Sequence, residues 1–184
     1  MFERMREDIA VIQERDPAAR SALEVMLLYN GFKAIRAHRK ANWFYRHRMK
    51  FIARWISQRC VRRTNIEIHP AAQIGRRLFI DHGTGVVIGE TTVIGEHVKL
   101  YQGVTLGAKS FAVKADGTLV KGNKRHPNIG NNVVIYAGAT ILGGDTYIGD
   151  NCVIGGNVWL THSVEPGKRV LTAREQTEFV TTDI

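Results

Sequence analysis

From residue 68 onward, large aliphatic residues recur every six positions. They are Ile68, Ile74, Ile80, Ile88, Ile94, Leu100, Leu106, Ile129, Ile135, Ile141, Ile148, Ile154 and Leu160. A fixed period predicts a repeat architecture in which each hexad is a short strand plus a turn, with its aliphatic side chain in a shared interior. Three strands would complete one triangular coil, so these thirteen hexads predict a mainly β protein, a parallel β-helix of about four coils. Glycine often follows the aliphatic residue and is expected to ease the corner turns.

The first 65 residues show helical patterning instead. Asp16-Pro17 has the form of a helix N-cap followed by proline, and Asn30-Gly31 that of a helix stop. Apolar residues at helical spacing resume at Phe32 and continue to Ile56. We therefore predict three parts: an α-helical N-terminal region (1–65), a β-helix catalytic domain (66–165) and a C-terminal tail (166–184).

Two interruptions of the six-residue period stand out. The first interruption adds two residues between Ile80 and Ile88, in the segment IDHGTGVVIGE, and it contains the adjacent acid and base Asp81 and His82. Repeat packing does not require an imidazole there, although Asp81 could simply cap a turn. The second is an excursion over 108–128, and long excursions in compact domains are usually functional or disordered.

The net charge of +9 is concentrated in the helical region. Residues 1–65 contain 15 Lys/Arg against 6 Asp/Glu, and no acid occurs between Glu24 and Glu67. Three interpretations are a nucleic-acid or acidic-membrane surface, a field that attracts a polyanionic cofactor, and a solvated helical face. No nucleic-acid-binding motif accompanies the charge, and Trp and Phe at helical spacing more often form core. We therefore expect neither nucleic acid nor membrane as a partner.

The remaining composition favours a cytoplasmic location. No apolar run approaches the ~20 residues that span a bilayer, and the N-terminal residues lack the apolar core of a signal peptide. The two cysteines, Cys60 and Cys152, are not in a metal-ligand spacing and make a disulfide framework improbable.

The candidate chemistry is limited to a few histidines and carboxylates. The sequence has no P-loop, no Gly-x-Ser-x-Gly, no Cys-x-x-Cys and no His-Glu-x-x-His. A histidine whose ring is oriented by a carboxylate can take a proton from a hydroxyl near neutral pH. His82 is the leading candidate and Glu67, 15 residues upstream, is a candidate partner, but spacing does not establish their contact. His69 and His97 are better interpreted as surface residues at coil corners.

Three segments carry a resemblance to a known family. RDPAAR…LLYNGFKAIRAHR (15–39), IEIHPAAQIGRRLFIDHGTGVVIGETTVIG (66–95) and YQGVTLGAKS…RHPNIG (101–130) resemble the serine O-acetyltransferases of the hexapeptide-repeat acyltransferase superfamily. The resemblance implies a left-handed β-helix, a homotrimer or a dimer of trimers, and acetyl transfer from acetyl-CoA to L-serine in cysteine biosynthesis.

The same resemblance implies residue roles. His82 matches the catalytic base and Glu67 its paired carboxylate. Asp16 and Asp81 match the acids that bind the serine amino group, and Arg125 and His126 the pair that binds its carboxylate. Positions along the acetyl-CoA groove are matched by Gly107, Ala108 and Ala137. No metal is implied.

The resemblance also implies regulation and a partner. L-Cysteine often inhibits this family by occupying the serine site. Members that end in isoleucine insert it into O-acetylserine sulfhydrylase, which gives Ile184 a role in docking; an ordinary frayed terminus is the alternative.

Other functions remain open at this point. An acetyltransferase for a sugar, an antibiotic or homoserine would share the fold and the histidine. A carbonic anhydrase of the same architecture would need three zinc-binding histidines, for which His82, His97 and His126 could be proposed, but their spacing does not match that family. A nucleic-acid-binding helical region on an inert solenoid is the non-catalytic alternative.

Overall fold

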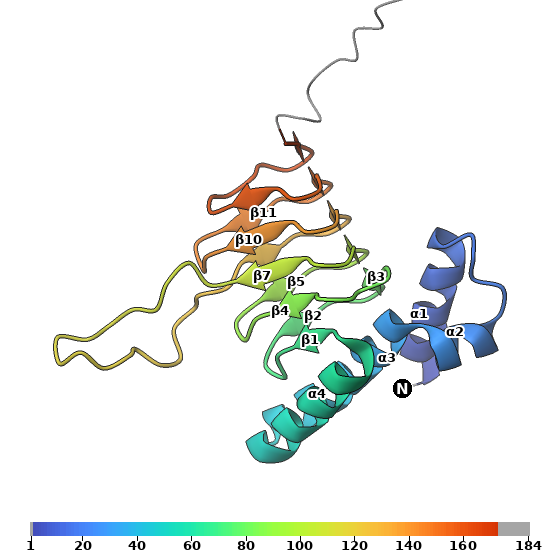
Figure 1. The fold of residues 1–184 in the computed structure, drawn as a ribbon, viewed down its shortest axis with the longest axis horizontal. Coiled ribbons are helices and arrows are strands. Elements are labelled where there is room, and N and C mark those ends of the chain that lie inside the picture. Colours follow the sequence, from blue (N-terminus) through green and yellow to red (C-terminus); the bar gives the residue numbers. More distant parts are fainter. Residues whose placement is uncertain (1, 173–184) are drawn as a thin grey trace, which may run out of the picture.

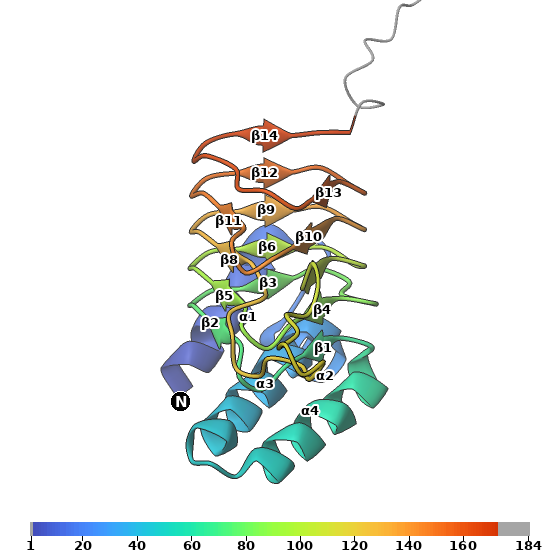
Figure 2. The same cartoon turned by 90° about the vertical axis from the view of Figure 1, so that its left-hand side faces the viewer.

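A computed structural model describes residues 2–172 and shows four helices followed by a stack of short strands (Figure 1). The helices lie at the end of the stack where the first strands are found (Figure 2). They are α1 (Phe2–Arg15), α2 (Ala22–Leu28), α3 (Asn30–Arg46) and α4 (Lys50–Thr64). None of these helices is long and apolar enough to cross a bilayer.

The strands form three parallel sheets, one for each side of a triangular stack. The first sheet contains β1 (Glu67–Ile68), β4 (Val87–Ile88), β7 (Thr105–Gly107), β10 (Thr140–Leu142) and β13 (Trp159–Leu160). The second contains β2 (Gln73–Ile74), β5 (Val93–Ile94), β8 (Asn128–Ile129) and β11 (Tyr147–Ile148). The third contains β3 (Phe79–Ile80), β6 (Lys99–Leu100), β9 (Val134–Ile135), β12 (Val153–Ile154) and β14 (Arg169–Val170). The N-terminal helices and the parallel sheets confirm the predicted architecture at this level.

The sheet extends past residue 165, where the sequence predicts that the tail begins. Val153 of β12 pairs with Arg169 of β14, and Ile148 forms a parallel bridge with Val164. No hexad motif precedes β14, so the six-residue period does not reveal this last strand. Ile184 lies outside the described residues.

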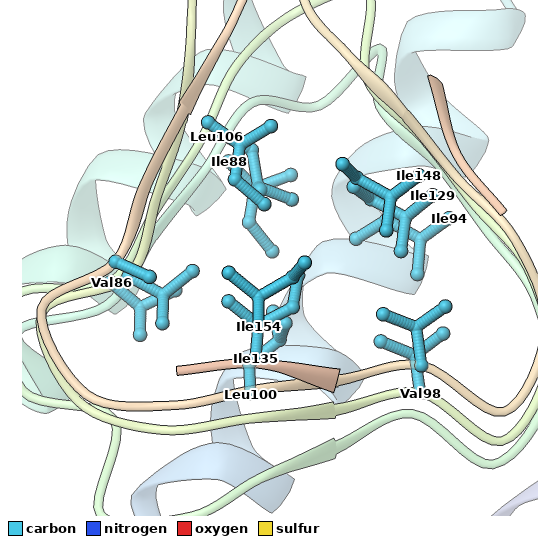
Figure 3. Close-up of a cluster of buried hydrophobic side chains, with 14 of the residues drawn as sticks. Val86, Ile88, Ile94, Val98, Leu100, Leu106, Ile129, Ile135, Ile148 and Ile154 are labelled. Atoms are coloured by element: carbon cyan, nitrogen blue, oxygen red, sulfur yellow. The ribbon is translucent and has the colours of Figure 1, made fainter. Parts of the chain in front are cut away.

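The interior is a column of stacked aliphatic side chains, as the period predicts. Ile80, Leu100, Ile135 and Ile154 lie in register on one side of the triangle, and all four are buried. Figure 3 shows the last three of them stacked. Val86 and Val98 fill two of the corners. Each buried side chain of this size stabilises the fold by about 1.5–3 kcal/mol, so the column is the main source of stability.

The corner turns use glycine differently from the prediction. The glycines that directly follow the aliphatic residues, such as Gly75 and Gly95, do not have positive φ. They are required because a Cβ on Gly75 would lie 2.5 Å from the carbonyl oxygen of Gly95 in the next coil. The left-handed residue comes two positions later, as at His97 (φ 59°) and Asn132 (φ 55°).

The helix boundaries differ from those read in the sequence. Asp16 follows α1 and does not cap a helix; the N-cap of α2 is Ser21, whose hydroxyl accepts a hydrogen bond from the Glu24 N–H. Asn30-Gly31 begins α3 instead of ending a helix. Gly31 is needed for close packing, since a Cβ there would lie 2.2 Å from the carbonyl oxygen of Ile80.

Helix α1 is fixed to the rest of the molecule by apolar packing and by ion pairs. Val11 and Ile12 pack in a small core with Phe32 and with Phe79 of β3. The buried carboxylate of Asp8 pairs with Arg39 of α3, and Glu7 pairs with Arg76. Asp16, the residue after α1, is thereby held beside the third sheet.

The excursion that leaves β7 projects away from the stack (Figure 1). Its distal part is a hairpin with an antiparallel bridge between Val113 and Leu119, both of them exposed. It returns through Arg125 and His126 to β8.

Candidate functional site

His82 occupies a protruding turn at the corner between the third and first sheets. His82 and Gly83 have φ values of 56° and 87°. Two consecutive residues in this conformation accommodate the two-residue insertion, and the aliphatic stacking continues on both sides. Gly83 cannot carry a side chain here, because its Cβ would lie 2.5 Å from Ile66 Cδ1. The His82 side chain is exposed and has no hydrogen-bond or ionic partner within residues 2–172.

Glu67 lies on β1 close to this corner. Its neighbour Ile66 packs under Gly83, and the Glu67 N–H donates to the Val86 carbonyl at 2.8 Å. Its carboxylate is 3.5 Å from Arg54 of α4 and does not contact His82 in the described structure. The predicted pairing of Glu67 with His82 stays a prediction.

Tyr29 hydrogen-bonds to Asp16 and lies within range of the charge of Asp81, although the two carboxylates are far apart in the sequence. The Tyr29 hydroxyl donates to Asp16 Oδ2 at 2.8 Å, and the Ala18 N–H donates to Asp16 Oδ1 at 2.8 Å. Burial, the hydrogen bond to Asp16 and the nearby negative charges, including Asp81, raise the pKa of Tyr29 to about 12. Tyr29 is therefore protonated at neutral pH and remains a donor. We call Asp16, Tyr29, Asp81 and Lys99, which pairs with Asp81, the acidic pocket.

Arg125 and His126 lie at another corner, between the first and second sheets. Arg125 pairs with Glu90, which also accepts from the Tyr45 hydroxyl at 3.4 Å. Burial by itself would raise the pKa of Glu90, but the hydrogen bond from Arg125 and the adjacent positive charge outweigh it, so the carboxylate is ionised. We call Glu90, Thr91, Arg125 and His126 the basic corner.

His126 is held in one tautomer by the backbone of Thr91. The Thr91 N–H donates to His126 Nδ1 at 3.1 Å, which places the proton on Nε2 when the ring is neutral. Burial, and then the positive charge of Arg125, lower the pKa of His126 to about 4. His126 is therefore a neutral N–H donor near pH 7, and it does not add a second cation to Arg125.

The candidate acetyl-CoA positions are divided between these two corners. Gly107 ends β7 at the basic corner, where its carbonyl accepts from the Gly143 N–H at 3.1 Å, and Ala108 begins the excursion. Ala137 lies at the His82 corner two coils further along, next to Tyr136, whose ring stacks on Tyr101 at 5.0 Å. Within one chain, strand β4 and its flanking turns separate His82 from the basic corner.

The histidines proposed for a zinc site lie at three different corners of the triangle: His82, His97 and His126. In the part of the chain that the structure describes, no group of three or more His, Cys, Asp or Glu is arranged to hold a metal.

Cavity size does not identify the site. A cavity of about 960 Å³ between α3 and the turn after β1 contains none of the predicted site residues. A smaller one of about 310 Å³, at the base of the excursion, includes Arg125 and Gly143. The site is therefore defined by its side chains and not by the volume of a cavity.

Sequence reasoning missed Tyr29, Lys99 and Glu90. Glu90 lies two residues after the aliphatic residue of its hexad, where Glu96, Asn131 and Asp150 occur in other hexads, so its sequence position carries no signal. The contacts of Tyr29 and Lys99 depend on how the helices pack on the third sheet, which the six-residue period does not describe.

Comparison with known proteins identifies the family to which the chain belongs. Residues 1–37 match the family model described as "Serine acetyltransferase, N-terminal". The chain is 51% identical over 164 residues to a serine acetyltransferase of Staphylococcus epidermidis, covering 89% of this chain and 72% of that protein. This chain belongs to the serine acetyltransferase family. It is also 52% identical over 159 residues to a plasmid-encoded serine acetyltransferase of Synechococcus elongatus, covering 86% of this chain but 50% of that protein, so it spans about half the length of that relative.

Solved structures of serine acetyltransferases show the same similarity. The Neisseria gonorrhoeae enzyme in complex with serine aligns with a TM-score of 0.83 at 36% identity, covering 94% of this chain and 66% of that one. The Entamoeba histolytica enzyme in complex with L-cysteine aligns with a TM-score of 0.85 at 38% identity, covering 91% and 62%. The Brucella abortus enzyme in complex with coenzyme A aligns with a TM-score of 0.85 at 35% identity, covering 94% and 65%.

Proposed function

We propose that this chain is a serine O-acetyltransferase that converts L-serine and acetyl-CoA into O-acetylserine and CoA for cysteine biosynthesis. The observation that carries the proposal is the position of Asp16. The helical region brings this carboxylate to Tyr29 beside the third sheet, near Asp81, and Asp81 directly precedes the exposed His82. Two carboxylates beside an exposed imidazole fit a substrate with an ammonium group next to a reactive hydroxyl.

His82 acts as the general base in the proposed reaction. A neutral ring nitrogen removes the proton from the serine hydroxyl while the hydroxyl oxygen attacks the acetyl carbonyl carbon. The tetrahedral intermediate then collapses, the carbon–sulfur bond of the thioester breaks, and the thiolate of CoA takes the proton back from His82. General-base assistance of this kind contributes about 10²–10⁴ in rate. Glu67 would turn from Arg54 to orient the ring.

The two ends of serine are recognised by different chemistry. Asp16 and Asp81 would accept hydrogen bonds from the ammonium group. Arg125 would pair with the α-carboxylate and the neutral His126 would donate Nε2–H to it, two charge-assisted hydrogen bonds that a sugar substrate would not use. L-Cysteine presents the same ammonium and carboxylate groups, which supports its action as a feedback inhibitor at this site.

A site made of these parts requires more than one subunit. His82 with the acidic pocket lies at one corner of the triangle and Arg125 with His126 at another, so packing of three flat-sided stacks would bring one corner of each subunit against the other corner of its neighbour. We infer a homotrimer of left-handed β-helices with about four coils each, with 66–165 as the catalytic domain. A dimer of trimers is the alternative. Acetyl-CoA would lie in the groove between subunits, along Gly107, Ala108 and Ala137.

Three further parts of the proposal rest on the family. The enzyme acts in the cytoplasm, requires no metal, and docks O-acetylserine sulfhydrylase through Ile184. Equal binding of the sulfhydrylase to the full chain and to a chain without Ile184 would contradict that docking role.

Thiol release from acetyl-CoA tests the function. The wild type is expected to release CoA with L-serine and much more slowly with L-homoserine or an amino-group-free sugar. His82→Asn should lose at least about 100-fold of this activity. His97→Asn is the matched control, because both histidines have positive φ, which Asn tolerates, and it should stay near the wild type. Near-normal turnover of His82→Asn, or a preference for the sugar, would refute the assignment.

A further inference from the structure

Lys99 lies beside the acidic pocket and has two aromatic neighbours. It points outward from β6, and its register partner on β3 is Phe79. Its Nζ lies 4.8 Å from the centre of the Phe79 ring and 4.5 Å from the centre of the Tyr101 ring. The same Nζ is 3.0 Å from Asp81 Oδ2, and the exposed fractions of the two side chains are 14% and 19%.

The environment formed by Asp81 and the two aromatic rings keeps Lys99 charged. Burial works against the ammonium, but the interactions with Tyr101 and Asp81 outweigh it and raise the pKa of Lys99. Ring faces also attract a cation and hold it in place. Asp81 is therefore not a free carboxylate, because one of its oxygens has a permanent internal partner.

Asp16 is held in a different way. Its two donors in the described structure, the Ala18 N–H and the Tyr29 hydroxyl, are neutral. They orient the carboxylate without offsetting its charge. The four residues of the acidic pocket thus carry two carboxylates and one ammonium, which leaves one net negative charge among them; the charge of Glu24 also acts on Tyr29 from outside this set.

We propose that Lys99 is a positioning residue for amino-group recognition: it holds Asp81 in place and offsets its charge, so that the pocket matches a substrate with a single ammonium group. This inference rests on the proposed function. Asp16 then supplies the negative charge that attracts the ammonium group, and Asp81 serves as an acceptor that is fixed in position.

Removal of Lys99 should partly restore the serine binding that is lost when Asp81 is replaced by Asn. Asp81→Asn removes the partner of Lys99 and leaves an uncompensated, largely buried cation beside the ammonium site. Serine binding is then weakened by two effects: the loss of an acceptor, and a new repulsion between Lys99 and the ammonium group of serine. Removal of Lys99 in the same chain eliminates the repulsion, so the second substitution should improve the first. A lysine that merely packs against Phe79 and Tyr101 would give additive losses instead.

The experiment is a double-substitution cycle read as KM for L-serine and kcat at saturating acetyl-CoA. Asp81→Asn is expected to raise KM at least tenfold. Adding Lys99→Met to Asp81→Asn is expected to lower KM at least threefold from the value of the single variant. In both variants kcat should change less than KM. Lys168→Met, at an exposed lysine near β14, is the matched control and should recover nothing. Lys99→Gln replaces Lys99→Met if melting shows that the apolar variant is unfolded.

The possible failures are distinguishable. Wild-type protein without serine-dependent CoA release overturns the proposed function and this inference with it. An active wild type in which the double variant binds serine as poorly as Asp81→Asn, or worse, overturns the role of Lys99 alone.

Discussion

The hydroxyl of Tyr29 lies 2.8 Å from Oδ2 of Asp16 and joins two segments of the helical region at the edge of the third sheet. Tyr29 follows α2, and Asp16 follows α1. Neither residue belongs to the repeat, yet together they complete the acidic pocket beside Asp81. The helical region therefore contributes directly to the proposed serine site.

Substitution of Tyr29 by Phe should weaken serine binding and leave the chemistry intact. The ring would remain packed, but Asp16 would lose a donor that fixes its carboxylate. We expect KM for L-serine to rise about tenfold, since a hydrogen bond to a charged group contributes about 1.5 kcal/mol or more. The values of kcat and of KM for acetyl-CoA should change little in initial-rate measurements. Tyr147→Phe, at a half-exposed tyrosine on β11, is the control; equal effects of the two substitutions would contradict the role of Tyr29.

A methyl group at Gly89 should disturb the basic corner. The Cβ of Gly89→Ala would lie 1.9 Å from His126 Cδ2, so the ring must leave its position against Thr91. We expect a loss of about 1–3 kcal/mol in the free energy of unfolding, together with a higher KM for L-serine. Combining Gly89→Ala with His126→Ala should recover stability in urea unfolding but not serine binding. No recovery of stability would show that the clash is not with His126.

Two buried histidines should make the protein less stable in acid. Burial, followed by the charge of Arg39, lowers the pKa of His38 to about 4, and the pKa of His126 is also about 4. Above about pH 6.5 both are neutral in the folded and unfolded states. Below that pH the unfolded chain takes up protons that the folded chain does not, so stability falls as the pH decreases toward 4, by about 2 kcal/mol per histidine between pH 7 and pH 5.

His38→Gln tests this pH dependence. The difference in unfolding free energy between pH 7 and pH 5, measured with urea, should shrink by about 2 kcal/mol relative to the wild type. His47→Gln changes the exposed histidine at the C-cap of α3, the helix that contains His38, and is the control that should leave the difference unaltered. An unchanged pH dependence of His38→Gln would mean that His38 is not buried in its neutral form.

The sequence was most informative where one physical rule repeats. Each hexad must place an aliphatic side chain in a shared interior, so the positions of β1 to β13 could be predicted from Ile68 to Leu160. The last strand, β14, has no hexad motif, and its pairing with β12 could not be predicted. The sequence predicts wrong boundaries for α2 and α3, because Asp16 and Gly31 have the forms of helix signals but serve the acidic pocket and the packing on Ile80.

The site was only partly predictable for a related reason. The break in the period at Asp81 and His82 is visible in the sequence, since no packing rule calls for an imidazole there. The partners that control charge are not visible: Lys99 occupies an ordinary outward position of its hexad, and Glu90 an ordinary turn position. Their roles depend on contacts between strands of successive coils and between distant segments.

In the proposed trimer, His82 and the basic corner of one active site come from different subunits. Mixing subunits that carry His82→Asn with subunits that carry Arg125→Gln, followed by reassembly, tests it most directly. Each variant alone should release very little CoA with L-serine, whereas a random equal mixture should regain about a quarter of the wild-type activity, because about one interface in four of a cyclic trimer then combines an intact His82 with an intact Arg125. A mixture no more active than the separate variants would show that the active site is not shared between subunits in this way.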